Sequence, residues 1–277
     1  MLATALSPLQ SSEYEKIREL VYAQSRINLG ANKRELVAAR LGKRIRALKL
    51  GSYREYVHFL GGRQGQEELL HLIDAISTNH TYFFREEMHF EFLATEALPA
   101  LTKRSRTEPI RIWSAACSSG EEPYSLGIHL SEHLKGGREW SIACSDISTR
   151  ILQKAQLGIF ADERLRGVSP SLQKKYFQRG YGEWEGHSRA VEGLRRRLAF
   201  QRVNLVEAPY PWKTTFDIVF LRNVMIYFDR PTQEEVVNLI ARCLRPGGYL
   251  IIGQSESLTG IKQPYLTLRP SVYQKPA

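Results

Sequence analysis

An apolar run that stops abruptly at two polar residues narrows the choice of fold for this chain. The run is Phe216–Leu221, and Arg222 and Asn223 follow it directly. Consecutive apolar residues with little polar alternation predict a strand buried on both faces, as in a parallel sheet. Ligands of such sheets bind beyond the carboxyl ends of the strands, and polar side chains are costly to bury there without a partner. The run therefore predicts a parallel sheet with a ligand site at the end of this strand.

The composition is that of an ordinary globular chain. Of 277 residues, 43% are apolar and 25% are charged, which suffices for one large domain or two smaller ones. Residues 1–6 have neither the basic nor the long apolar region of an export signal, and no apolar run reaches the roughly 20 residues of a membrane span. Three scattered cysteines, Cys117, Cys144 and Cys243, are too few for a disulfide framework or a zinc site. We therefore expect a cytoplasmic protein without direct membrane insertion.

The net charge of +10 is unevenly distributed. Residues 26–54 contain nine lysines and arginines and a single acid, Glu35. A basic face attracts acidic partners, whether nucleic acid, anionic lipid or an acidic protein, and the alternative is a merely solvated face. The scarcity of acids over several helical turns favours a docking surface. The basic residues are Arg26, Lys33, Arg34, Arg40, Lys43, Arg44, Arg46, Lys49 and Arg54.

The periodicity of apolar residues changes near residue 108. Before it, apolar residues lie three and four apart, which predicts a helical N-terminal domain over residues 1–78 and a helical connector over residues 79–107. Residues 108–277 alternate strands and helices, which predicts a doubly wound parallel sheet with a small inserted subdomain at about residues 161–197. In the insertion we expect a helix opening at Ser169-Pro170 and a hairpin over residues 189–198. The expected strands are 110–115, 140–144, 198–203, 216–221 and 249–252, and the expected helices are 121–134, 148–156 and 231–244.

The turn that follows the first expected strand is rich in small residues, which allow the backbone to approach a ligand closely. It is not a G-x-G-x-x-G sequence, and its helix opens with Glu121 and Glu122, two anions where a pyrophosphate would otherwise bind. These acids suit a ligand with cationic centres and no phosphate, such as S-adenosylmethionine. Alternatively, they only complement the helix dipole.

The second expected strand ends at Asp146. An acid at this point of a strand–helix–strand unit is placed to accept hydrogen bonds from the two hydroxyls of a ribose. Alternatively, Asp146 caps the helix that begins near Ser148. Both interpretations are open at this point.

Several segments together resemble the chemotaxis receptor methyltransferases, the CheR family. They follow the order and spacing of that family between residues 79 and 256, whereas the N-terminal domain is similar mainly in its helical character. Cys117, Ser118 and Gln254 depart from the family's usual residues, but none of the three is among its cofactor contacts. The segments are Asn79-His80-Thr81-Tyr82-Phe83-Phe84-Arg85, Trp113-Ser114-Ala115-Ala116, Ser119-Gly120-Glu121-Glu122-Pro123-Tyr124-Ser125, Ser145-Asp146-Ile147, Val203-Asn204-Leu205, Arg222-Asn223-Val224-Met225-Ile226-Tyr227-Phe228-Asp229 and Ser255-Glu256.

The resemblance implies an all-helical N-terminal domain and a class I methyltransferase domain with a small inserted β-subdomain. It implies methyl transfer from S-adenosylmethionine to glutamate side chains of methyl-accepting chemoreceptors, at cytoplasmic chemoreceptor arrays, with S-adenosylhomocysteine as product. The family places an arginine and a tyrosine near the reacting methyl group, matching Arg85 and Tyr227. In some relatives the inserted subdomain also binds the C-terminal tail peptide of a receptor. The family's cofactor contacts match Asn79, Thr81, Arg85, Glu122, Asp146, Asn204, Leu205, Arg222 and Asn223.

Carboxyl methylation makes modest chemical demands on these residues. A glutamate side chain, whose pKa is ordinarily about 4.3, is ionised at neutral pH and needs no general base. The protein has to align oxygen, methyl carbon and sulfur at contact distances of roughly 3–3.5 Å and exclude water. Thr81 and Arg85 are four residues apart, so they share one face if the connector is helical. We expect Arg85 to orient the acceptor carboxylate and Tyr227 to shape the methyl channel or donate to the carboxylate.

Other functions are consistent with parts of the sequence. A nucleic-acid methyltransferase is favoured by the basic charge and by Arg195-Arg196-Arg197, but the chain lacks an Asn-Pro-Pro-Tyr signature and a stripe of interleaved aromatic and basic residues, so no nucleic-acid partner is expected. An adaptor that binds S-adenosylmethionine without turnover would not need Arg85 and Tyr227. His129 and His133 have helical spacing but no evident third ligand, so no metal is expected. We expect the basic helices to dock on the acidic methylation region of chemoreceptors.

Overall fold

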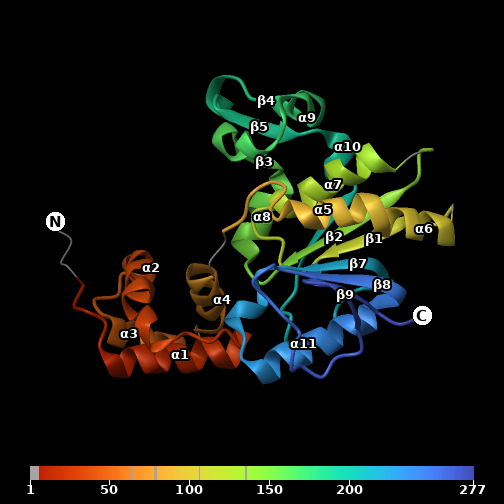
Figure 1. Ribbon diagram of the computed structural model, residues 1–277. Coiled ribbons are helices and arrows are strands. Elements are labelled where there is room, and N and C mark those ends of the chain that lie inside the picture. Colours follow the sequence, from red (N-terminus) through yellow and green to blue (C-terminus); the bar gives the residue numbers. More distant parts are fainter. Residues whose placement is uncertain (1–5, 64, 78–79, 106, 135) are drawn as a thin grey trace. The chain divides into compact units, whose positions relative to one another are not determined.

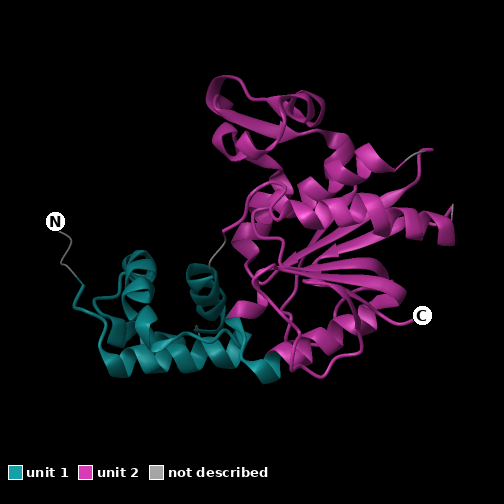
Figure 2. Cartoon of the chain, in the orientation of Figure 1, with its two compact units in different colours: residues 1–78, 227–232 teal, residues 79–226, 233–277 magenta. Residues whose placement is uncertain are grey.

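The computed structural model describes residues 6–277 except 64, 78–79, 106 and 135. The chain divides into two units, which Figure 2 colours separately. The first unit comprises residues 1–78 and 227–232, and the second comprises residues 79–226 and 233–277. Asn79, one of the expected cofactor contacts, lies outside the described residues.

The first unit is built from helices, as the apolar spacing predicted. Each helix buries the stripe of apolar residues that the spacing defines, and Ile17, Val21, Leu41, Ile45 and Leu72 are completely or almost completely buried. The elements are α1 (Ser11–Ser25), the 3-10 turn η1 (Ala31–Lys33), α2 (Arg34–Ala47), α3 (Tyr53–Leu60) and α4 (Gly65–Ile76).

A buried polar cluster joins α2, α3 and α4. The carboxylate of Glu68, 3% exposed, accepts hydrogen bonds from Arg44 Nε at 2.7 Å, Arg44 Nη2 at 2.6 Å and the Tyr56 hydroxyl at 2.9 Å. Arg44, expected among the docking residues, therefore serves the interior of this unit. Lys43 and Arg46 on the same helix are exposed, as a docking surface requires.

The second unit is organised by a seven-stranded sheet with the order β6-β2-β1-β7-β8-β10-β9. Neighbouring strands from β6 to β8 are parallel, but β10 runs antiparallel to both β8 and β9. The expected doubly wound sheet is thus confirmed as a mixed sheet, whose last two strands the apolar pattern did not predict. The strands are β1 (Ile110–Ser114), β2 (Trp140–Asp146), β6 (Leu198–Arg202), β7 (Phe216–Leu221), β8 (Leu244–Ile252), β9 (Leu266–Arg269) and β10 (Val272–Gln274).

Helices cover both faces of this sheet. Figure 1 shows α5, α6 and α7 on one face and α11 on the other. All six residues of β7 are buried, because helices shield both of its faces. The helices are α5 (Glu87–Phe92), continued by a π-helical turn (Leu93–Ala97) into α6 (Leu98–Arg104), then α7 (Glu121–His133), α8 (Thr149–Leu157) and α11 (Arg230–Cys243).

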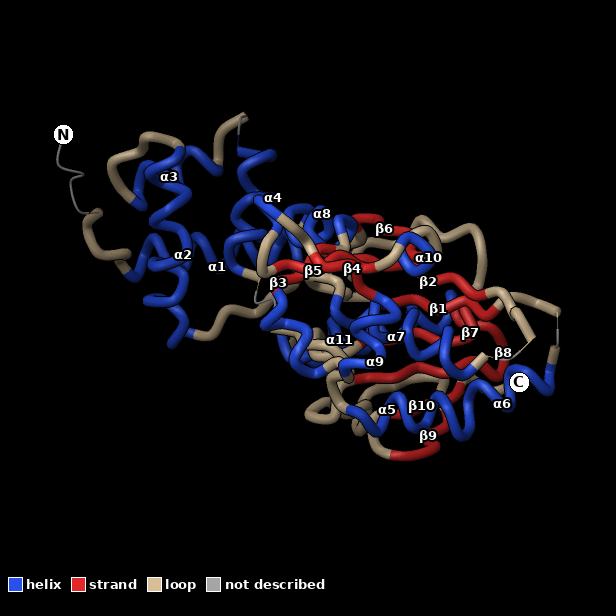
Figure 3. The backbone as a smooth tube through the Cα atoms, turned by 90° about the horizontal axis from the view of Figure 1, so that it is seen from above, coloured by secondary structure: helices blue, strands red, loops and turns tan. Residues whose placement is uncertain are grey.

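The insertion between α8 and β6 contains a separate antiparallel sheet with the order β3-β5-β4, visible in Figure 3. Ser169 caps α9 by accepting from the Leu172 N–H, as Ser169-Pro170 predicted. The hairpin expected over residues 189–198 is wrong: this stretch contains the end of β5, the short helix α10 and the start of β6, and the hairpin is formed by β4 and β5. The elements are β3 (Ile159–Ala161), η3 (Asp162–Gly167), α9 (Pro170–Tyr176), β4 (Phe177–Arg179), η4 (Gly182–Trp184), β5 (His187–Ala190) and α10 (Glu192–Arg195).

The connector is helical only from Glu87 onward, so the helix expected over its first part is wrong. Residues 80–86 form an irregular turn in which Phe84 and Glu86 have φ angles of 54° and 59°. The Phe83 ring anchors this turn, because it packs edge-on against Phe160 and Phe177 with centroid distances of 4.9 and 5.6 Å. Residues 80–84 are His, Thr, Tyr and two Phe, which are weak helix formers, so local preference does not oppose this turn.

Candidate functional site

The predicted polar residues gather at the carboxyl ends of the parallel strands. Ser114 ends β1, Asp146 ends β2, and Arg222 and Asn223 follow β7. The registers place Ser114 beside Cys144 of β2 and Phe220 of β7, so these strand ends lie at one edge of the sheet. Asp146 and Arg222 are only 7% and 6% exposed, so their polar groups need partners from the protein or from a ligand.

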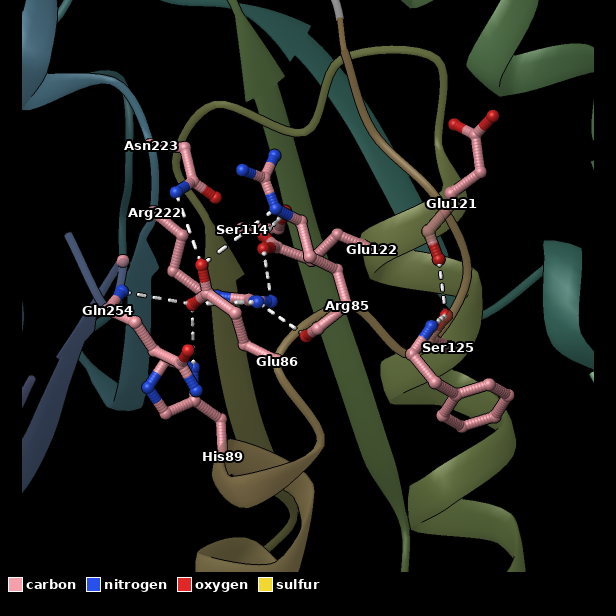
Figure 4. A network of polar contacts seen from close by, with 12 residues as sticks. Arg85, Glu86, His89, Ser114, Glu121, Glu122, Ser125, Arg222, Asn223 and Gln254 are labelled. Atoms are coloured by element: carbon pink, nitrogen blue, oxygen red, sulfur yellow. Dashed lines mark hydrogen bonds and ion pairs between the residues drawn. The ribbon is translucent and has the colours of Figure 1, made fainter. Parts of the chain in front are cut away.

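Arg222 lies at the centre of a network that Figure 4 shows from close by. Its Nε lies 3.3 Å from Oε2 of Glu86, and its Nη1 lies 3.1 Å from Oε2 of Glu122. Its Nη2 donates to the main-chain oxygen of Arg85. One guanidinium therefore connects the end of β7 to the start of α7 and to the turn before α5.

The two glutamates at the start of α7 differ in their roles. Glu121 is completely buried and pairs with Arg164, whose Nε lies 2.9 Å from Oε1. Glu122 instead faces Arg222 and accepts a hydrogen bond of 2.6 Å from Ser114 Oγ. Burial raises the pKa of Glu122, although Arg222 and Ser114 favour its charged form. Glu121 is thus engaged within the protein, and Glu122 belongs to the strand-end cluster.

Asp146 is held in place by backbone groups. Its Oδ2 accepts from the Ser118 N–H at 2.9 Å and its Oδ1 from the Ser148 N–H at 3.0 Å. The cap of α8 is the Ser148 side chain, which accepts from the Ile151 N–H at 3.2 Å. The helix-capping interpretation of Asp146 is therefore wrong in detail, and its carboxylate organises the turn after β1.

The remaining expected contacts lie in loops. Asn204 and Leu205 lie one residue beyond the end of β6 and are both buried, and Asn204 Nδ2 donates to Glu207 at 2.9 Å. Thr81 is 9% exposed and lies in the irregular turn before α5. Because that turn is not helical, the one-face argument for Thr81 and Arg85 does not hold.

The guanidinium of Arg85 is supported by its own turn. Its Nη1 donates to the main-chain oxygen of His80 at 2.9 Å, and its Cζ lies 5.7 Å from the centroid of the Tyr82 ring. The Arg85 side chain is 24% exposed, so an acceptor can reach it. Tyr227 ends the short helix η5 (Met225–Tyr227) and belongs to the first unit, where its main-chain oxygen accepts from the Asn28 N–H at 2.8 Å.

Sequence reasoning assigned no role to two carboxylates of this region. Glu86 accepts hydrogen bonds from Arg222, from Asn223 Nδ2 at 3.3 Å and from the Gln254 N–H at 3.2 Å. Glu256 accepts hydrogen bonds from the backbone N–H of Asn223 at 2.9 Å and from that of Gly253, just after β8, at 2.7 Å. The only available signal was position, because both residues lie inside or next to the segments that resemble the CheR family.

The cysteines and histidines that could act as nucleophiles or metal ligands lie in surroundings that favour a structural role. Cys117 and Cys144 are buried, and burial raises the pKa of both thiols, which disfavours reactive thiolates. The rings of His129 and His133 stack with centroids 4.0 Å apart. Within the described part of the chain, no group of three or more potential ligands is arranged to hold a metal ion. None of the helices described is long and apolar enough to cross a membrane.

The donor set fits S-adenosylmethionine better than a phosphorylated cofactor. Glu86 and Glu122 both pair with Arg222, and Oε1 of Glu86 also lies 3.8 Å from Nε of Arg85. Together with Asp146 at the end of β2, this places acidic groups where a cationic ligand with a ribose would be bound. The sheet and this edge define a class I methyltransferase that uses S-adenosylmethionine.

Comparison with known proteins identifies the family. The family described as "CheR methyltransferase, SAM binding domain" matches residues 79–273, and that described as "CheR methyltransferase, all-alpha domain" matches residues 12–77. The chain belongs to the CheR methyltransferase family.

Curated relatives agree with this assignment. The chemotaxis protein methyltransferase of Klebsiella aerogenes is 40% identical over 268 residues, which cover 96% of this chain and 90% of the relative. That of Borreliella burgdorferi is 36% identical over 273 residues, covering 96% and 95%. That of Escherichia coli is 37% identical over 267 residues, covering 96% and 91%.

Proposed function

We propose that this protein methylates glutamate side chains of bacterial chemoreceptors, forming glutamyl methyl esters. The observation that carries the proposal is that both domains of the CheR family are matched. Ser114, Glu122, Arg222 and Asn223 at the strand ends also belong to one polar network, which Figure 4 shows. S-adenosylmethionine, when bound, supplies a methyl group on a positively charged sulfur. The acceptor oxygen forms the new bond to that carbon as the bond to sulfur breaks, and no proton is transferred.

The proposed donor-binding residues are those that match the cofactor contacts of the CheR family. Asp146 accepts from the ribose hydroxyls, and the acidic cluster around Glu122 favours the ammonium group. Asn204 and Leu205 lie after β6, next to β2 in the sheet, and contribute to the same pocket. The proposed contacts are Asn79, Thr81, Arg85, Glu122, Asp146, Asn204, Leu205, Arg222 and Asn223.

Arg85 orients the acceptor carboxylate. Its guanidinium is pre-organised by the hydrogen bond to His80 and by the Tyr82 ring, which reduces the entropy lost on binding. A planar guanidinium binds a carboxylate with two parallel hydrogen bonds, which fixes the direction of the attacking oxygen. Tyr227 shapes the methyl channel or donates to the same carboxylate.

The acidic methylation region of the receptor docks on the exposed basic residues of the first unit, including Lys43 and Arg46 on α2. Opposite charges speed the encounter and make it sensitive to salt. The inserted subdomain presents Tyr181 and Trp184, which are 85% and 52% exposed, as contacts for a receptor tail peptide. These interactions place the protein at chemoreceptor arrays in the cytoplasm.

One assay tests the function. The protein is incubated with S-adenosylmethionine labelled in its methyl group and with either receptor-containing membranes or RNA. Carboxyl methyl esters release methanol in mild base, whereas methylated bases do not. We expect base-labile label on the receptors, and base-stable label on RNA or no label at all would refute the proposal.

A further inference from the structure

Glu86 occupies an unusual place for a carboxylate. It directly follows Arg85 and precedes the first residue of α5, and its side chain is 10% exposed. Its backbone is left-handed, with a φ of 59°, a conformation that is unfavourable for residues other than glycine. The surroundings therefore hold Glu86 in this conformation. Its hydrogen bonds show which groups its carboxylate faces.

The carboxylate of Glu86 contacts three polar groups that follow the ends of two strands. Oε2 lies 3.1 Å from Arg222 Nη2 and accepts from the Gln254 N–H at 3.2 Å, and Oε1 accepts from Asn223 Nδ2 at 3.3 Å. Figure 4 shows these contacts converging on Glu86 from β7 and β8. A single side chain thus links the turn that carries Arg85 to the residues that follow both strands.

We propose that Glu86 is a positioning residue of the methyl-donor site, which holds the Arg222 and Asn223 side chains in the arrangement that binds the donor. The inference rests on the proposed function of this edge of the sheet. Asn223 also has a left-handed backbone, with a φ of 56°, so its amide direction depends on the contacts that its side chain makes. Without the Glu86 charge, Arg222 keeps Glu122 as its carboxylate partner and turns toward it.

The electrostatic surroundings agree with a charged Glu86. Burial acts to raise the pKa of Glu86, but the positive charge of Arg222 and the hydrogen bonds from Asn223 and Arg222 outweigh it and lower the pKa. The side chain is therefore ionised at neutral pH. A neutral amide of the same shape removes this charge without leaving a cavity.

The test compares Glu86→Gln with Glu87→Gln in the full-length protein. Glu87 is the adjacent carboxylate and is exposed, so its variant controls for loss of one negative charge. Calorimetric titration with S-adenosylhomocysteine should show roughly tenfold to a hundredfold weaker binding for Glu86→Gln and unchanged binding for Glu87→Gln. Thermal unfolding without ligand should show that Glu86→Gln remains folded.

A double-mutant cycle separates positioning from a merely structural role. If Glu86 acts through Arg222, adding Glu86→Gln to Arg222→Gln should weaken binding much less than it weakens binding of the unaltered protein. Additive effects, or equal binding by Glu86→Gln and the unaltered protein, would overturn the inference and leave the proposed function intact. If the unaltered protein does not bind S-adenosylhomocysteine, the proposed function and the inference both fail.

Discussion

Each unit of the protein buries a cluster of arginine and carboxylate groups, and the two clusters are built differently. In the first unit, Arg44 meets the Glu68 carboxylate with short hydrogen bonds of 2.6–2.9 Å, and the Tyr56 hydroxyl completes the set. In the second unit, Arg222 is shared between Glu86 and Glu122 at 3.1–3.3 Å.

We expect this difference between a cluster that holds a fold together and one that binds a ligand, as proposed for the second. Paired charges with several good hydrogen bonds offset the desolvation of burial, so the Arg44–Glu68 pair needs nothing further. In the second cluster two carboxylates share Arg222 at longer distances, and Glu86 also lies 3.8 Å from Arg85, so its charges are less tightly paired than those of Arg44 and Glu68. Left-handed backbone at Phe84, Glu86 and Asn223 adds strain beside the second cluster, a feature common at functional sites.

The largest expected effect is the kinetic loss caused by Arg85→Ala. If Arg85 orients the acceptor as proposed, the variant should methylate receptors about a hundredfold or more slowly, while its unfolding free energy changes little. Initial rates with receptor membranes measure this. Arg242→Ala is the control, since Arg242 is exposed in the last turn of α11. Arg104 is unsuitable as a control, because its Nη2 donates to the buried Asp217 at 2.6 Å. Equal rates for the two variants would refute the role of Arg85.

Arg44→Ala, in contrast to Arg85→Ala, should lower the stability of the protein and leave its site unaffected. It leaves the Glu68 charge buried without its cation, so we expect a loss of about 3 kcal/mol in unfolding free energy. Binding of S-adenosylhomocysteine by the folded protein should be unchanged. Urea denaturation and calorimetry measure the two quantities. A variant with normal stability would show that the Arg44–Glu68 pair does not hold the fold together.

The two clusters should also differ in how stability depends on pH. His89 lies beside Glu86, with Nδ1 3.4 Å from Oε2, and burial lowers its pKa from 6.5 to about 4. Between these values the unfolded chain takes up a proton that the folded protein does not. The histidine therefore lowers stability as the pH falls, by at most about 1.4 kcal/mol per pH unit.

The His89→Gln variant checks this pH dependence. Urea denaturation at pH 7 and pH 5 should show a smaller loss of stability for the variant than for the unaltered protein. His58→Gln, at an exposed position of the first unit, serves as the control and should leave the loss unchanged. An identical loss in His89→Gln would mean that His89 takes up its proton equally in both states.

The smallest expected effect concerns docking. Reversing the charges of Lys43 and Arg46 to Glu should slow receptor methylation severalfold at low salt and much less at high salt. The matched control reverses Lys103 and Arg242, exposed residues of the second unit, with the same change in net charge. Affinity for S-adenosylhomocysteine should not change in either variant. Methylation that survives intact at low salt would refute docking through α2.

Patterns of neighbouring residues predicted the main strands and helices, because the spacing of apolar residues reflects which positions are buried. The uninterrupted apolar run of β7 is buried at every residue, and the small residues after β1 do form the turn that precedes α7. Strands β9 and β10 escaped prediction because they are only four and three residues long, too short to show a clear apolar pattern. β9 also forms the edge of the sheet, and most of its residues are exposed. The turn over residues 80–86 escaped prediction because Phe83, which anchors it, packs against Phe160 and Phe177, residues that lie far away in the sequence.

The amino-acid pattern alone was enough to place Arg222 and Asn223 at the end of a buried strand, since apolar periodicity is a property of neighbouring residues. It could not distinguish Glu121 from Glu122, or Arg44 from Arg46, because their partners lie elsewhere in the chain. Glu86 and Arg222 are separated by 136 positions and meet only when the sheet has formed. The three-dimensional fold therefore determined which charges are paired, and long-range pairing leaves no periodic trace along the chain.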